Sequence, residues 1–242
     1  IVQDRNGLLI PFANLNIDYQ YLTTKDSQQR TDDVFGQTGI SGTYTLNSTP
    51  PGMNYTISAS VYGIVFNSTN FNNLKAEPVS EVTIICPSRT LTFKILDYNH
   101  NAIPNARLAL LEVTAGIFYG ATTDSNGLVT VEATFGKYRT RIYSGSVLLN
   151  ETVIDTFNDK EVEVQCVLFS LPVTVKVADY FGQPIPNANV RITGPEGTAQ
   201  SEKTQADGTA TFNKVTGGDM QIVAYLTEND DYYEARNVHV ES

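Results

Sequence analysis

The sequence predicts an all-β protein built from three tandem antiparallel β-sandwich domains. A segment of one pattern occurs three times, at residues 4–15, 97–108 and 179–190. Between glycine and proline turns, apolar and polar residues alternate, as they do in strands that bury one face. No stretch of the sequence shows the 3.6-residue period of an amphipathic helix. Sheets with one apolar face bury it by packing together, so these observations favour sandwiches.

Composition limits the class of protein. The chain has 242 residues, enough for two or three sandwiches of roughly 100 residues each. Hydrophobic residues make up 41%, which indicates a globular chain, and only 17% are charged. The formal net charge of -10 argues against nucleic acid as a partner, because a phosphate backbone needs cationic side chains. We expect no membrane span, since no run of about 20 apolar residues occurs.

Each copy of the repeated segment has the same order of features. An aspartate is followed by a turn, then by Ile-Pro, one variable residue, an alanine and an alternating strand. The three copies of the central motif are Ile10-Pro11-Phe12-Ala13, Ile103-Pro104-Asn105-Ala106 and Ile185-Pro186-Asn187-Ala188. Turns at residues 124–127 and 207–208 end in glycine, which tolerates the positive φ of a hairpin turn. We therefore expect a hairpin after the motif strand.

The strands on either side of the motif alternate as well. In the first strands, the residues expected to face inward are Leu91, Phe93 and Ile95, and again Val173, Val175 and Val177. The closing strands are expected to face inward through Val82-Ile84-Cys86, Val162-Val164-Cys166 and Val238-Val240-Ser242. This alternation is typical of antiparallel sheets with one wet face.

The repeated pattern resembles a known family. Its fullest copy has Asp179, Gly182, residues 184–188 and Asp207-Gly208, and it is similar to the carboxypeptidase regulatory-like and collagen-adhesin B-type repeats. The resemblance implies transthyretin-like or Ig-like sandwiches that serve as spacers, stalks or binding modules. Such adhesin domains often carry an isopeptide bond from a core-facing lysine. Lys94 and Lys176 alternate outward, so we predict no such bond.

We expect the domains at residues 1–87, 88–170 and 171–242, with short linkers near 87–89 and 170–172 and hence a stiff rod. Repeat 1 has only a truncated first strand, and Ser242 is expected to be equivalent to Cys166. The opening residues 1–4 do not look like a signal peptide. Two interpretations remain open: the chain is a piece of a longer array, or another chain supplies the missing edge by strand donation.

No catalytic site, metal site or cofactor is predicted. His100 lies in a turn and His239 faces outward, and neither has ligands at metal-site spacing. Cys86 and Cys166 are equivalent positions a domain length apart, too far for a disulfide, so we expect buried free thiols. Acidic loop residues that lack the spacing of an EF-hand are interpreted as turns. These residues are Asp32-Asp33, Asp124-Ser125-Asn126 and Asn229-Asp230-Asp231.

Four sequons are candidates for N-glycosylation if a glycosylating cell secretes the chain. Their asparagines are Asn47, Asn54, Asn67 and Asn150. The alternation of the neighbouring residues and the turns predict that all four are exposed.

The function favoured by these observations is a non-enzymatic, extracellular structural protein: a subunit of a cell-surface filament, pilus or surface layer. Its expected partners are copies of itself or other surface proteins. The composition, rich in Asn, Thr and Tyr and free of Trp, is similar to that of surface proteins of thermophilic archaea. The alternative is a stalk, or a carbohydrate- or protein-binding module, of a larger secreted adhesin or enzyme. Aromatic residues that could stack on sugars are Tyr119, Tyr143, Tyr232 and Tyr233.

Overall fold

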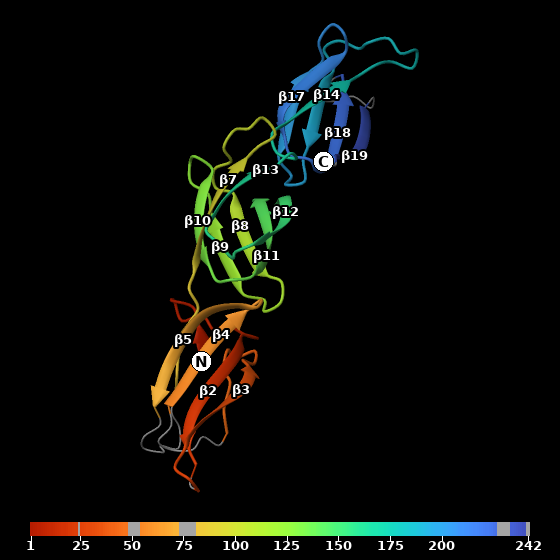
Figure 1. Cartoon of the computed structure of the whole chain (residues 1–242). Coiled ribbons are helices and arrows are strands. Elements are labelled where there is room, and N and C mark those ends of the chain that lie inside the picture. Colours follow the sequence, from red (N-terminus) through yellow and green to blue (C-terminus); the bar gives the residue numbers. More distant parts are fainter. Residues whose placement is uncertain (24, 48–53, 73–80, 227–232, 241–242) are drawn as a thin grey trace.

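The computed structural model describes residues 1–23, 25–47, 54–72, 81–226 and 233–240. It is all-β: every helix or strand element in these residues is a strand, and the strands form six sheets, mostly antiparallel. Three consecutive parts of the chain each contribute one four-stranded sheet and one smaller sheet. We call these parts the N-terminal unit (residues 1–87), the middle unit (88–170) and the C-terminal unit (171–242). Figure 1 shows them one after another along an elongated molecule, from red to blue.

The N-terminal unit contains β1 (Val2–Gln3), β2 (Asn14–Leu22), β3 (Gln29–Gln37), β4 (Asn54–Val61), β5 (Ile64–Asn72) and β6 (Ile84–Ile85). Its four-stranded sheet has the order β3-β2-β4-β5, with antiparallel neighbours. The short strands β1 and β6 pair in parallel.

The middle unit contains β7 (Arg89–Leu96), β8 (Arg107–Glu112), β9 (Phe118–Thr122), β10 (Leu128–Ala133), β11 (Lys137–Ser144), β12 (Val147–Asp155) and β13 (Lys160–Gln165). One sheet has the order β10-β7-β13, in which β13 runs parallel to β7, and the other has the order β12-β11-β8-β9.

The C-terminal unit contains β14 (Leu171–Lys176), β15 (Asn189–Thr193), β16 (Ala199–Lys203), β17 (Thr209–Val215), β18 (Gly218–Tyr225) and β19 (Tyr233–Val240). Its sheets are β14-β17 and β16-β15-β18-β19. Apolar residues at alternate positions form the core of each unit, as the sequence predicts. In β7, for example, Leu91, Phe93 and Ile95 are completely buried.

The repeated motif makes the same turn in all three units. One carboxylate oxygen of Asp97 accepts hydrogen bonds from the backbone N–H groups of Asn99 and Asn101, both at 2.8 Å. Asp4 and Asp179 each accept the equivalent pair. The aspartate therefore holds the turn that leads into Ile-Pro.

A buried threonine completes the motif and was not singled out from the sequence. The hydroxyl of Thr123 accepts the N–H of Ala106 at 2.8 Å and donates to the carbonyl of Ile103 at 2.7 Å. Thr38 and Thr204 make the same two bonds in their units. Buried backbone groups need hydrogen-bond partners, and this hydroxyl supplies them on both sides of the motif proline.

Two expectations about the strands were wrong. Val238 and Val240 lie in β19, which pairs with β18 in the four-stranded sheet. They are thus equivalent to the end of β12, not to Val164 in β13. Alternation shows which residues share a face, but it does not show which sheet the strand joins. The linker positions also differ, because Arg89 already begins β7 and Leu171 already begins β14.

The first joint, between the N-terminal and middle units, is an apolar contact with a polar centre. The ring centroids of Phe135 in the middle unit and Phe66 in the N-terminal unit lie 6.0 Å apart. The guanidinium carbon of Arg89 lies 4.7 Å from the centroid of the Phe135 ring. Beside this contact, the hydroxyl of Tyr62 donates to the buried carboxylate of Glu112 at 2.5 Å. Tyr62 lies in the turn between β4 and β5, so this hairpin reaches into the middle unit.

The second joint, between the middle and C-terminal units, is sparser. The N–H of Gly217 donates to the carbonyl of Leu168 at 2.7 Å, and the Leu168 side chain lies against this glycine. The Glu196 carboxylate lies next to Gly145 in the β11–β12 turn. In the described residues, the buried cores of these two units form separate clusters.

Candidate functional site: the open edge of β14

The first strand of each unit has one edge at which a parallel strand can pair, and we call this edge the seat. In the middle unit, β13 occupies the seat on β7. Lys160 of β13 pairs with Leu91 of β7, and the register continues to the pair of Gln165 and Leu96. In the N-terminal unit, β6 occupies the equivalent seat on β1. β14 pairs with β17 on one side, and no described strand pairs with its other side. The edge of β14 is therefore open within the described part of the chain.

The open edge exposes part of the core of the C-terminal unit. Val173, Val175 and Val177 are half-buried, whereas the equivalent residues in β7 are fully buried. Ile222 and Ala224, on the facing sheet, are also half-buried and pack on the same cluster. Unpaired backbone groups beside an apolar surface are what an added strand requires.

The tip of the C-terminal unit is exposed as well. Tyr180 and Phe181 are 97% and 83% exposed and lie edge to face with each other. In the equivalent turn of the middle unit, the N–H of Tyr98 donates to the carbonyl of Phe169, and Asn99 donates to the carbonyl of Ser170. That turn is therefore covered by the segment that leads into the next unit, and the tip at Tyr180 is not covered by any described residue.

An asparagine fastens the seated strand to the opposite sheet. Asn67 in β5 donates its side-chain amide to the carbonyl of Ile85 at 3.0 Å, and Asn150 in β12 donates to the carbonyl of Gln165 at 3.1 Å. Both lie next to a register shift in their hairpins. At the equivalent place in the C-terminal unit, β18 and β19 pair without a shift, and Glu234 is an exposed residue. An asparagine is thus found at this position in the two units whose seat is occupied, and a glutamate is found there in the C-terminal unit, whose seat is open.

The four asparagines predicted as N-glycosylation candidates differ in how far their side chains are exposed. Asn47 and Asn54 are exposed, and the rest of the Asn47 sequon lies outside the described residues. Asn67 is exposed and Asn150 is half-buried, and the amides of both are engaged as just described.

Cys86 and Cys166 are both free and fully buried. Burial raises the pKa of the Cys86 thiol to about 11 and that of Cys166 to about 12.

Two of the tyrosines considered for sugar binding, Tyr119 and Tyr143, are described, and each packs against a neighbouring side chain. The ring of Tyr119 packs 6.0 Å from the buried Tyr138, whereas Tyr143 is covered by the guanidinium of Arg107 at 4.4 Å. Tyr232 and the side chain of Tyr233 lie outside the described residues.

The remaining candidates are turn or surface groups. Asp124 accepts two backbone N–H groups within its own turn, and residues 229–231 lie outside the described part. Lys94 is exposed and pairs with Glu163 at 3.0 Å. His239 contacts Asp219 at 2.6 Å. No group of three or more His, Cys, Asp or Glu in the described residues is placed to hold a metal ion.

The described residues contain no helix that is long and apolar enough to cross a membrane.

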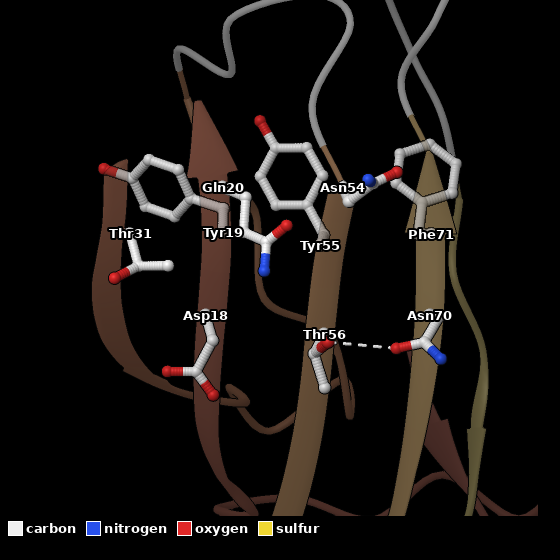
Figure 2. A pocket seen from close by; sticks show the side chains of 9 residues that line it. All are labelled: Asp18, Tyr19, Gln20, Thr31, Asn54, Tyr55, Thr56, Asn70 and Phe71. Carbon is white, nitrogen blue, oxygen red and sulfur yellow. Dashed lines mark hydrogen bonds between the residues drawn. The ribbon is translucent and has the colours of Figure 1, made fainter. Parts of the chain in front are cut away.

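The N-terminal unit has a cavity of about 380 Å³ on its four-stranded sheet. Figure 2 shows the side chains that line it, from all four strands. Six of them are polar and occupy alternate positions, so they share one face of the sheet. They are Asp18, Gln20, Thr31, Asn54, Thr56 and Asn70. This cavity escaped the sequence reasoning, because only the pairing of four strands brings its residues together.

No family model and no curated protein sequence matches the chain. Among solved structures, a streptococcal ancillary pilin aligns with 93% of this chain and 88% of its own, at 12% identity and a TM-score of 0.35. The shaft pilin spaA from Lactobacillus rhamnosus GG aligns over 62% and 92%, at 10% identity and a TM-score of 0.29. The Bacillus anthracis TIE protein aligns over the whole chain at 15% identity and a TM-score of 0.31. The chain spans 47% of the length of that last protein.

Proposed function

We propose that the chain is a non-enzymatic, extracellular structural protein, a subunit of a cell-surface filament, pilus or surface layer, assembled by strand donation. The observation that carries this proposal is the open edge of β14 beside a half-buried core. In this assembly, a strand from a neighbouring molecule takes the seat that β13 takes on β7.

The occupied seats indicate what kind of strand fits. β13 runs parallel to β7 and turns Val162 and Val164 toward the core, with the charged Glu163 between them. A donated strand therefore runs parallel to β14 and carries apolar residues at alternate positions. It covers Val173 and Val175, and each such side chain gains about 1 kcal/mol or more from burial.

The exposed tip extends the proposed contact. Tyr180 and Phe181 lie on the end of the C-terminal unit that corresponds to the end of the middle unit at the second joint. Large aromatic side chains are common at the centre of protein interfaces, where they contribute much of the binding energy. A molecule that donates a strand to β14 would also cover this tip.

The first test is size-exclusion chromatography of the purified protein together with negative-stain electron microscopy. The proposal predicts regular fibres or sheets, whose amount increases with protein concentration. Residues 156–166 are then fused after Ser242, which offers β14 a strand in cis. We expect this variant to stay monomeric and to unfold at a higher temperature.

A matched fusion provides the control. It carries the same segment with Val162 and Val164 both replaced by Asp, which keeps its length but removes the apolar face. We expect this variant to assemble like the parent chain. A parent protein that remains a monomeric rod at all concentrations would rule out self-assembly through β14. Equal assembly of both fusions would show that another surface joins the molecules.

The second candidate is a stalk or a binding module of a larger secreted adhesin or enzyme. The elongated arrangement of the units (Figure 1) and the polar cavity of the N-terminal unit (Figure 2) favour it. A monomeric rod that binds a saccharide would support this function over the filament.

A further inference from the structure

The cavity of the N-terminal unit lies on a face of its sheet that is rich in amides and hydroxyls. Gln20 of β2 stands opposite Thr31 of β3 and Asn54 of β4. One row further along, Asp18 stands opposite Thr56, which in turn stands opposite Asn70. These two rows place donors and acceptors side by side across four strands.

Hydrogen bonds within the face orient several of these groups. The carbonyl oxygen of Gln20 accepts from Gln29 at 2.6 Å, which leaves the Gln20 amide nitrogen to donate elsewhere. Thr56 donates to the carbonyl oxygen of Asn70 at 2.9 Å (Figure 2), so the amide of Asn70 is fixed in the same way. Groups that are held in place before binding lose less conformational entropy when a ligand arrives.

The carboxylate of Asp18 supplies the strongest acceptor of the cavity. It is exposed, and the amide of Asn16 lies 3.3 Å and 3.4 Å from its two oxygens. A carboxylate can accept hydrogen bonds from two neighbouring hydroxyl groups at once.

The lining selects for the chemical class of the ligand. None of the nine residues that line the cavity is Lys, Arg or His, so an anion finds no opposite charge. Asp18 is the single carboxylate among these nine, and even with Asp33 opposite it in β3 the carboxylates are too few for the six to eight oxygen ligands of a hard cation such as Ca²⁺. Three of the nine, Tyr19, Tyr55 and Phe71, are aromatic, but a purely apolar ligand would leave the amides and hydroxyls of the other six unpaired. A neutral molecule with many hydroxyl groups meets all three conditions.

An exposed aromatic ring lies on the same face. Phe35 of β3 stands opposite Asn16, two residues along the strand from the position opposite Asp18. Its side chain is 73% exposed. An exposed ring next to hydrogen-bonding groups offers an apolar surface to the C–H groups of a sugar ring.

We propose that this face binds a neutral saccharide, with Asp18, Gln20 and Asn70 as hydrogen-bonding residues and Phe35 as a stacking platform. The saccharide has two possible sources. It is a glycan of another molecule, or it is the protein's own glycan on Asn54, whose sequon lies on the wall of the cavity.

The test for the first source uses protein from a bacterial host that does not N-glycosylate. It is applied to an array of neutral oligosaccharides, and the strongest hit is measured by calorimetry. We expect Asp18→Ala and Gln20→Ala to weaken that hit about tenfold or more, since each removes a hydrogen bond with a charged or fixed group. Glu132→Gln, which removes an exposed strand carboxylate in the middle unit, should leave binding unchanged.

The test for the second source uses protein from a secretory host that N-glycosylates. Mass spectrometry reports whether Asn54 carries a glycan, and hydrogen exchange reports whether that glycan protects β2 and β4. Protection that Asp18→Ala removes would identify the protein's own glycan as the ligand. The proposal is overturned if the array shows no hit sensitive to Asp18 and Gln20 and no Asn54 glycan protects these strands. Neither outcome bears on assembly through β14, which lies in another unit.

Discussion

The two joints of the molecule connect equivalent ends of neighbouring units, yet they are built differently. The first joint has two phenylalanine rings in tilted contact and a tyrosine that donates a hydrogen bond to the buried carboxylate of Glu112. At the second joint, Gly145 and Gly194 stand where the first has Tyr62 and Glu112. One backbone hydrogen bond, from Gly217 to Leu168, crosses there with little buried apolar contact.

The difference teaches that a repeated fold does not imply a repeated joint. The units share the turn motif and the sheet order, but the joint depends on residues at the tips of hairpins. We expect the first joint to be stiff, because the buried carboxylate of Glu112 is hydrogen-bonded across it by Tyr62 and Phe135 is buried beside it. We expect the second to bend more easily, since interfaces with few buried contacts allow relative motion of domains.

The largest expected effect comes from emptying the first joint. Phe135→Ala removes a ring that is 5% exposed, and it should lower the free energy of unfolding by about 3–5 kcal/mol. The matched change at the second joint, Leu168→Ala, removes a half-buried side chain and should cost about 1 kcal/mol. Urea unfolding measures both. Equal losses would contradict the contrast between the joints.

Alkaline pH should destabilise the two cores that contain buried thiols, that of the N-terminal unit with Cys86 and that of the middle unit with Cys166. Burial raises the pKa of Cys86 to about 11 and that of Cys166 to about 12. In the unfolded chain these thiols lose their protons near their ordinary pKa of 9.0. The unfolded state therefore binds fewer protons above pH 9, and stability falls with rising pH until the folded pKa is passed.

Each thiol contributes a loss of roughly 2 kcal/mol by pH 11. Urea unfolding at intervals from pH 8 to pH 11 measures the slope. Cys86→Ala and Cys166→Ala should each make the slope shallower. A slope that neither substitution changes would assign the alkaline effect to other groups, such as the tyrosines.

Removing one hydroxyl tests the polar centre of the first joint. Tyr62→Phe leaves the buried Glu112 without this donor and should cost about 1–3 kcal/mol. It should also broaden the range of angles between the first two units, which small-angle scattering or residual dipolar couplings can measure. Tyr21→Phe, at a half-buried ring far from the joint, is the control and should change neither quantity.

The smallest effect is expected at the asparagine that fastens the seated strand. Asn150→Ala removes the hydrogen bond to Gln165 and should cost about 1 kcal/mol. Glu234→Ala, at the equivalent position beside the open edge, should stay within about 0.5 kcal/mol of the parent. Thermal unfolding compares the two, and a similar loss in both would mean that Asn150 does not act through β13.

The sequence predicts the fold well because the motif is local. The aspartate turn, the Ile-Pro step and the alternating strands all depend on residues close in sequence, and they occur three times. The sheet of Val238 was assigned wrongly, because β12 and β13 alternate alike and only pairing separates them. The pair of Tyr62 and Glu112 spans 50 positions, and the cavity needs four strands in register. Neither leaves a pattern in a single stretch of sequence.

The parallel pairing of β7 and β13 has a mechanical consequence. β7 starts at the first joint, and β13 ends at the second, so tension along the molecule pulls the two strands past each other lengthwise. All the hydrogen bonds between them are then strained together, whereas strands peeled from one end would lose them one by one. The middle unit is therefore built to resist stretching. At β14, the same resistance would require a parallel strand at the open edge, as in the proposed assembly.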